Sequence, residues 1–101
     1  MNQIERIKQM ERCLDHASVA VMELAAALEK YEAAKDSIQA LKTYYGSDEW
    51  RKDFEDDEAG RLPQNLKRGV LSEDGIWNLL ADCQEVNSLM QKALKEVQRE
   101  H

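Results

Sequence analysis

The stretch that decides the fold is residues 7–31, with the sequence IKQMERCLDHASVAVMELAAALEKY. Its apolar side chains follow one another in alternating steps of three and four residues, at Ile7, Met10, Leu14, Ala17, Val21, Leu24, Leu28 and Tyr31. An α-helix completes a turn in about 3.6 residues, so this spacing places them all on one stripe. The pattern predicts a long amphipathic helix of coiled-coil type.

Local signals set the two ends of this helix. Asn2 followed by Glu5 has the form of a capping box, which marks a helix start. Gly46 can adopt the left-handed conformation that closes a helix. We therefore expect a helix over residues 2–45, roughly 65 Å long. Between its two ends the stripe continues, after one shift of register, at Ala34, Ile38, Leu41 and Tyr45.

Two further helices follow. Ser47 and the acids after it predict a short helix over residues 48–58, which Gly60 ends. A turn over residues 63–68 starts at the proline, and Ser72 is the expected N-cap of a helix over residues 73–99. The stripe of this last helix also advances in steps of four and three, at Ile76, Leu80, Cys83, Asn87, Met90, Leu94 and Val97.

Neither long stripe is expected to remain in water. We expect a single all-α domain over residues 1–101, in which the two long helices form an antiparallel hairpin. The short helix and loop segment between them would fold over the hairpin end. The first helix is longer than the last, which leaves four apolar residues beyond the hairpin for self-association as a dimer: Ile4, Ile7, Met10 and Leu14. The alternative is a first helix that breaks and folds back into a compact monomer.

Composition excludes several classes of function. The chain of 101 residues has a formal net charge of −6, which argues against nucleic acid and anionic membranes as partners. Its most apolar window, residues 17–28, is too short to span a bilayer, and no export signal is evident. We expect a cytoplasmic protein whose two cysteines do not form a disulfide framework.

Candidate chemical sites are few. Cys13 and His16 are three residues apart, but Cys83 is too distant along the hairpin to complete a single-chain metal site. With only one other histidine, His101, no catalytic constellation can be assembled. We therefore expect neither enzymatic activity nor a cofactor.

Charged residues of the middle segment suggest two alternative sites. Asp53, Asp56 and Asp57 have a spacing that could let their carboxylates converge on a divalent cation. The other interpretation is a solvated helix face that pairs with nearby cations such as Arg61, Lys67 and Arg68. Lys67 and Arg68 also precede a helix start, where a small anionic or phosphate-bearing ligand could bind.

The middle segment also carries a family resemblance. Its motifs are YYGSDEW (residues 44–50), DDEAGRLP (56–63) and LKRGVLSED (66–74). With them, the chain resembles a family of small bacterial proteins catalogued only as a domain of unknown function. The resemblance implies a helical fold and a bacterial cytoplasmic setting, and it implies no activity.

The leading hypothesis is thus a non-enzymatic interaction module that self-associates through its first helix. The middle segment and the adjoining helix ends would present a surface to an unidentified protein partner. Its expected anchors are Trp50, Phe54, Leu62 and Trp77, each of which could instead serve only in packing.

Overall fold

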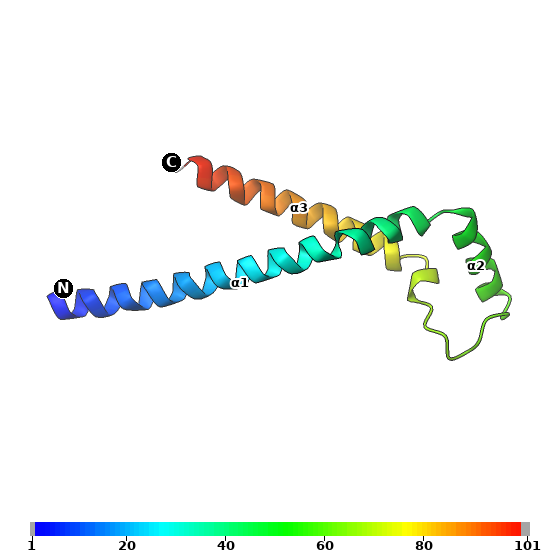
Figure 1. The fold of residues 1–101 in the computed structure, drawn as a ribbon, viewed down its shortest axis with the longest axis horizontal. Helices are drawn as coiled ribbons and strands as arrows, with labels where there is room; N and C mark the ends of the chain where they lie inside the picture. The colour runs from blue at the N-terminus through cyan, green and yellow to red at the C-terminus, as the bar shows by residue number, and fades with distance from the viewer. Residues whose placement is uncertain (1, 100–101) are drawn as a thin grey trace. The chain divides into compact units, whose positions relative to one another are not determined.

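The fold consists of helices only. The computed structural model describes residues 2–99, and within them it contains α1 (Gln3–Tyr44), α2 (Asp48–Glu58), the 3-10 turn η1 (Gly69–Leu71) and α3 (Gly75–Arg99) (Figure 1). No β-strand occurs in residues 2–99, so the all-α prediction is confirmed. The first residue and the last two of the predicted domain, Met1, Glu100 and His101, lie outside the described residues.

The helix α1 begins and ends where its local signals predict. The Asn2 side-chain oxygen accepts the backbone N–H of Glu5 at 2.8 Å, as in a capping box. At the other end Gly46 has a φ of +80°, and the Ser47 N–H donates to the Tyr44 carbonyl at 3.0 Å. The α-helical backbone between these ends is uninterrupted, so the broken helix of the alternative prediction does not occur.

The chain divides into two compact units, residues up to Asp36 and residues from Ser37 onward. The first unit is the N-terminal part of α1, a single helix with no buried residue. The second unit holds the last turns of α1 together with α2, η1 and α3.

In the second unit, α2 has a serine cap and a glycine stop. The Ser47 hydroxyl accepts the Trp50 N–H at 3.1 Å and donates to the Tyr44 carbonyl at 2.6 Å, which ties the start of α2 to the end of α1. Gly60, with a φ of +72°, then lets the Arg61 N–H turn back to the Asp56 carbonyl at 2.9 Å.

The start of α3 differs from the sequence-based expectation. The helix begins at Gly75, where Ser72 was expected to cap a helix starting at residue 73. The Ser72 hydroxyl accepts the Gly75 N–H at 3.0 Å and donates to the Gly69 carbonyl at 2.7 Å, so it joins η1 to α3. The first helical carbonyl belongs to Asp74, which accepts the Asn78 N–H at 2.8 Å.

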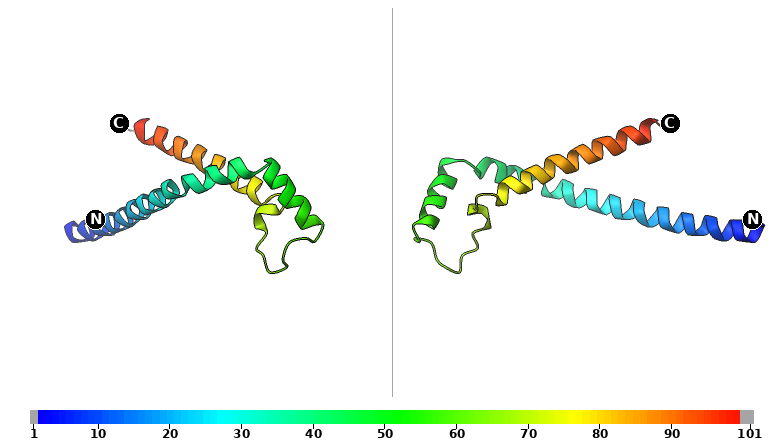
Figure 2. Two further views of the ribbon diagram at one scale, coloured as in Figure 1. Left: turned by 45° about the vertical axis from the view of Figure 1, so that its right-hand side comes forward. Right: turned by 180° about the vertical axis from the view of Figure 1, so that it is seen from behind.

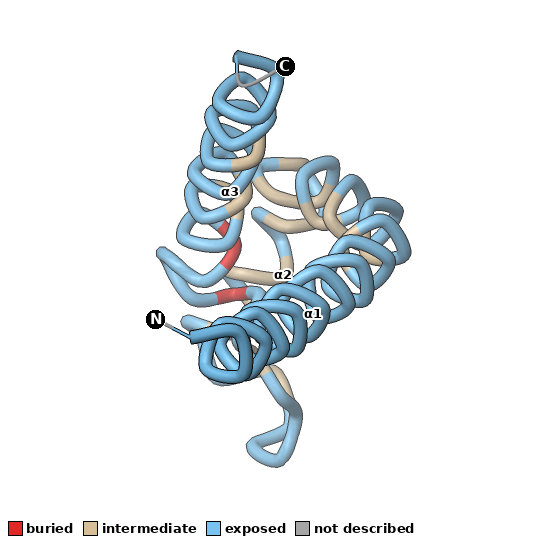
Figure 3. The backbone as a smooth tube through the Cα atoms, turned by 90° about the vertical axis from the view of Figure 1, so that its left-hand side faces the viewer, coloured by how far each residue is buried: buried red, intermediate tan, exposed pale blue. Residues whose placement is uncertain are grey.

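The core of the second unit is small. Among its described residues, those up to Arg99, the buried hydrophobic ones are Leu71 and Ile76, at 5% and 3% exposure (Figure 3). They lie on η1 and at the start of α3, and η1 contacts both α2 and α3. Full burial of two aliphatic side chains contributes only about 3–6 kcal/mol, so half-buried neighbours must supply much of the remaining stability.

The base of a helical hairpin lies within this unit. The last turns of α1 run toward α2, and α3 runs back in the opposite direction (Figures 1 and 2). Leu41 of α1 lines the same groove as Ile76 and Leu79 of α3, so both helices border this groove. The middle segment connects them, as the predicted hairpin requires.

Among residues 2–99, none of the helices combines the length and the apolar character needed to cross a bilayer.

Candidate functional site

The first unit exposes an apolar surface along α1, the stripe that begins at Ile7. The large aliphatic side chains of the stripe range from 43% exposed at Leu28 to 67% at Val21. The four residues predicted to mediate self-association are all open to solvent, at 65%, 53%, 53% and 60% exposure: Ile4, Ile7, Met10 and Leu14. A row of large exposed hydrophobics is typical of a surface that binds another molecule.

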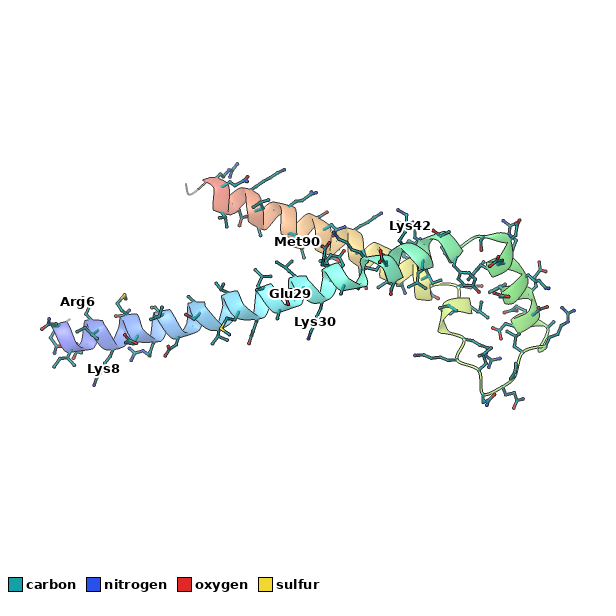
Figure 4. The ribbon with its side chains drawn as sticks, viewed as in Figure 1. Arg6, Lys8, Glu29, Lys30, Lys42 and Met90 are labelled. Carbon is teal, nitrogen blue, oxygen red and sulfur yellow. The ribbon has the colours of Figure 1, made fainter. Side chains whose placement is uncertain are left out.

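Charged side chains border this stripe. In Figure 4, Arg6 and Lys8 project from different sides of α1. Farther along, Glu32 and Lys35 form an ion pair of 2.9 Å within the helix. The hydrogen bond from Lys35 to Glu32, together with the charge of that carboxylate, raises the pKa of Lys35.

An aromatic cluster marks the junction of α1 and α2. The Trp50 ring stacks on Phe54 and meets Tyr45 edge-on, with both ring centroids 5.2 Å from its own. The indole N–H of Trp50 donates to the Val70 carbonyl at 2.9 Å, which fastens α2 to η1. Two of the four expected anchors, Trp50 and Phe54, are therefore half-buried in contacts within the chain.

The other two expected anchors lie elsewhere. Leu62 is half-buried in the loop after α2. Trp77 is 59% exposed on the first turn of α3 and so has the most open indole of the second unit. The structure thus brings two anchors together and places the other two on separate segments.

The three aspartates proposed as a metal site do not converge. Asp53 accepts the Tyr44 hydroxyl at 2.6 Å, Asp56 pairs with Arg61 at 2.8 Å, and Asp57 pairs with Arg68 at 3.0 Å. Among residues 2–99, no group of three His, Cys, Asp or Glu side chains is arranged to hold a metal ion. The structure therefore gives no support to the divalent-metal hypothesis, because each carboxylate binds its own partner from another segment.

The two cations proposed to bind an anion also separate. The Arg68 guanidinium is occupied by Asp57, and both side chains are partly withdrawn from solvent at 36% and 22% exposure. Lys67 instead lines a groove of about 420 Å³. The groove has an apolar lining for the most part, formed by Leu41, Val70, Ile76 and Leu79 together with Gly69 and Gly75.

The cysteines remain free thiols in both units. Cys13 is exposed in the first unit, where His16 is exposed as well. Cys83 is half-buried on α3 in the second unit.

Comparison with known proteins identifies the family. Residues 7–96 match the model of the family described as Domain of unknown function (DUF4298). The chain belongs to the DUF4298 family. The match covers the exposed stripe of α1, the aromatic cluster and nearly all of α3, so these features of the DUF4298 chain lie within the family's domain. No curated protein and no solved structure matches the DUF4298 chain.

Sequence reasoning missed two contacts of this DUF4298 chain. Tyr44 and Asp53 lie nine residues apart across a helix boundary, and Trp50 and Val70 lie twenty apart. Periodicity within one helix carries no information about such pairs. The available signal was the aromatic spacing of Trp50 and Phe54, which correctly predicted one shared face of α2.

Proposed function

We propose that the protein is a non-enzymatic interaction module that self-associates through the apolar stripe of α1. The observation that carries the proposal is the exposure of this stripe, because α1 has no buried residue over its 42 residues. The steps of three and four are those by which one helix packs against another like itself. A second copy of the chain offers a surface with the same spacing and length.

Helix lengths also favour a second chain. The helix α1 has 42 residues and α3 has 25. If α3 lay along α1 from the hairpin base, roughly 25 Å of α1 would still have no partner within the chain. That remainder contains the four self-association residues of the sequence prediction.

Sedimentation equilibrium tests the proposal with two matched variants. Leu14 lies on the stripe and is 60% exposed, whereas Val19 lies off it and is 54% exposed. Leu14→Glu and Val19→Glu both replace an apolar side chain by the same helix-compatible acid. We expect a dimer for the wild type and Val19→Glu at micromolar concentration, and a monomer for Leu14→Glu. A monomeric wild type at this concentration would refute self-association.

We further propose that α3 contacts a protein partner through Trp77, in a bacterial cytoplasmic setting. The support is the exposure of its indole, since tryptophan is enriched at interface hot spots. Affinity capture from the native cell should retain the partner with wild type and lose it with Trp77→Ala. The control is Leu89→Ala, because Leu89 is also 59% exposed on α3. Equal capture by all three proteins would remove Trp77 from the interface.

A further inference from the structure

We infer that two copies of α1 pair in parallel and in register over residues 7–31, as a two-stranded coiled coil. This inference rests on the proposed self-association and adds chain direction and register to it. In heptad notation, with positions a to g and Ile7 at a, the stripe residues alternate between the two seam positions. Position a holds Ile7, Leu14, Val21 and Leu28, and position d holds Met10, Ala17, Leu24 and Tyr31.

The distribution of β-branched residues is compatible with two strands in a parallel coiled coil. Ile7 and Val21 both stand at a, and no β-branched residue stands at d in this stretch. In parallel coiled coils, β-branched residues at a combined with leucine at d favour two strands, and Leu24 supplies the leucine. Each of these side chains is exposed in the single chain and so is open to a second copy.

Charge complementarity favours the same arrangement. Arg6 occupies position g and Glu11 the next position e. A parallel, in-register pair brings position g of one helix to position e of the following heptad of the other, so Arg6 meets Glu11 of the second copy twice by symmetry. No ion pair joins Arg6 or Glu11 to another residue in the part of the chain that the structure describes.

The antiparallel arrangement lacks this complementarity. If Ile7 stood opposite Tyr31 of the second copy, Arg6 would face Ala34 and Glu11 would face Ala25. Neither charge would then have a partner across the interface. The parallel pair is therefore the one in which the flanking charges match.

The seam has a defined end in each direction. The d position before Ile7 is Gln3, and the a position after Tyr31 is Lys35. Lys35 forms its ion pair with Glu32 of the same helix, which holds the ammonium beside the seam. Continuation would set two lysines against each other, so the paired region ends at Tyr31.

Cysteine cross-linking of the full chain tests direction and register. In a Cys13→Ser/Cys83→Ser background, Leu24→Cys places a thiol at position d. The parallel pair brings the two thiols face to face, within the reach of a disulfide. We expect Leu24→Cys to form a covalent dimer on mild oxidation, which appears on a non-reducing gel. The exposed control Val19→Cys, off the seam, should remain largely uncross-linked.

Mixing two cysteine variants distinguishes parallel from antiparallel pairing. In the antiparallel register Leu14 stands opposite Leu24 of the second copy, so a Leu14→Cys chain mixed with a Leu24→Cys chain would form the mixed disulfide. That product would overturn the parallel arrangement while leaving self-association intact. Sedimentation of the reduced samples tests whether the chains associate at all. A monomer in these samples would overturn both the proposed self-association and the parallel pairing.

A charge swap gives an independent test that introduces no new thiol. Glu11→Arg sets two arginines against each other in the parallel pair and should raise the dimer dissociation constant by about tenfold at low salt. Arg6→Glu/Glu11→Arg restores the attraction with reversed sign and should recover wild-type association. Failure of the double variant to recover would overturn the proposed charge pair, and with it the register.

Discussion

The Tyr44 hydroxyl donates a 2.6 Å hydrogen bond to Oδ2 of Asp53, and this bond joins the end of α1 to the middle of α2. Both residues are half-buried, and the charged acceptor strengthens the bond. We expect Tyr44→Phe to lower the free energy of unfolding by about 1 kcal/mol. Urea unfolding followed by circular dichroism measures this loss, at one fixed protein concentration because the proposed self-association would add to apparent stability.

Tyr45 offers a matched control for this substitution. Its hydroxyl lies 3.4 Å from the Glu73 carbonyl oxygen, which is at the long limit for a hydrogen bond. Tyr45→Phe should therefore change the free energy of unfolding by less than about 0.5 kcal/mol. Equal losses for the two variants would contradict a special role for the bond between Tyr44 and Asp53.

The same pair makes stability depend on alkaline pH. Burial, with the hydrogen bond to Asp53 as the second cause, raises the pKa of Tyr44 from 10.0 to about 12. The folded state therefore holds the phenol proton more tightly than the unfolded chain does. The resulting stabilisation is complete below pH 10 and is lost as the pH rises toward about 12.

Difference spectroscopy measures this effect directly. The phenolate absorbance of wild type minus that of Tyr44→Phe isolates the titration of one of three tyrosines. We expect its midpoint near pH 12, well above the ordinary value of 10.0. A midpoint at the ordinary value would show that neither burial nor the hydrogen bond to Asp53 raises the pKa of Tyr44.

Trp50 connects α2 to η1 through its indole N–H. Trp50→Phe keeps an aromatic ring for the stack on Phe54 but removes the donor that reaches the Val70 carbonyl at 2.9 Å. We expect a loss of about 1 kcal/mol in unfolding free energy. Trp77→Phe, at a 59% exposed position, should cost less than about 0.5 kcal/mol. The reverse order of the two losses would show that Trp77, not Trp50, is the structural tryptophan.

Gly75 lies where a side chain has no room. A Cβ at this position would lie 2.5 Å from the Gly69 carbonyl oxygen and 2.6 Å from the Ser72 hydroxyl oxygen. We expect Gly75→Ala to destabilise the chain by about 1–3 kcal/mol, although alanine is the better helix former. Gly69→Ala is the control, since a Cβ there meets no atom within 4 Å. A stabilised Gly75→Ala would mean that η1 shifts away at little cost.

Sequence alone predicted the features that depend on local chemistry. The cap at Asn2, the left-handed Gly46 and the cap at Ser47 each act within three residues of their partners, so the residues themselves specify them. The long stripe of α1 could also be predicted from the sequence, because the helical spacing of its apolar residues repeats within one element. The start of α3 was less exact: the helix begins at Gly75, two residues after the predicted residue 73, although the Ser72 hydroxyl does accept the Gly75 N–H.

The contacts of the three aspartates proposed as a metal site could not be predicted from the sequence. The spacing of Asp53, Asp56 and Asp57 predicts one shared face of α2, yet it does not show which residues that face contacts. Their partners come from α1 and from the loop after α2, at sequence separations of five to eleven residues. Pairing across turns depends on the path of the loop, which no short-range pattern encodes.

The first unit is one helix, and each of its backbone hydrogen bonds therefore joins residues four apart. Such a helix opens locally, without requiring the rest of the protein to unfold. Under the proposed self-association, the rate at which its amide protons exchange with heavy water should slow as protein concentration rises, while exchange near Leu71 should hold steady. Deuterium uptake along α1 would then report how much of the protein is assembled at any moment, even in a mixture where no dimer can be isolated.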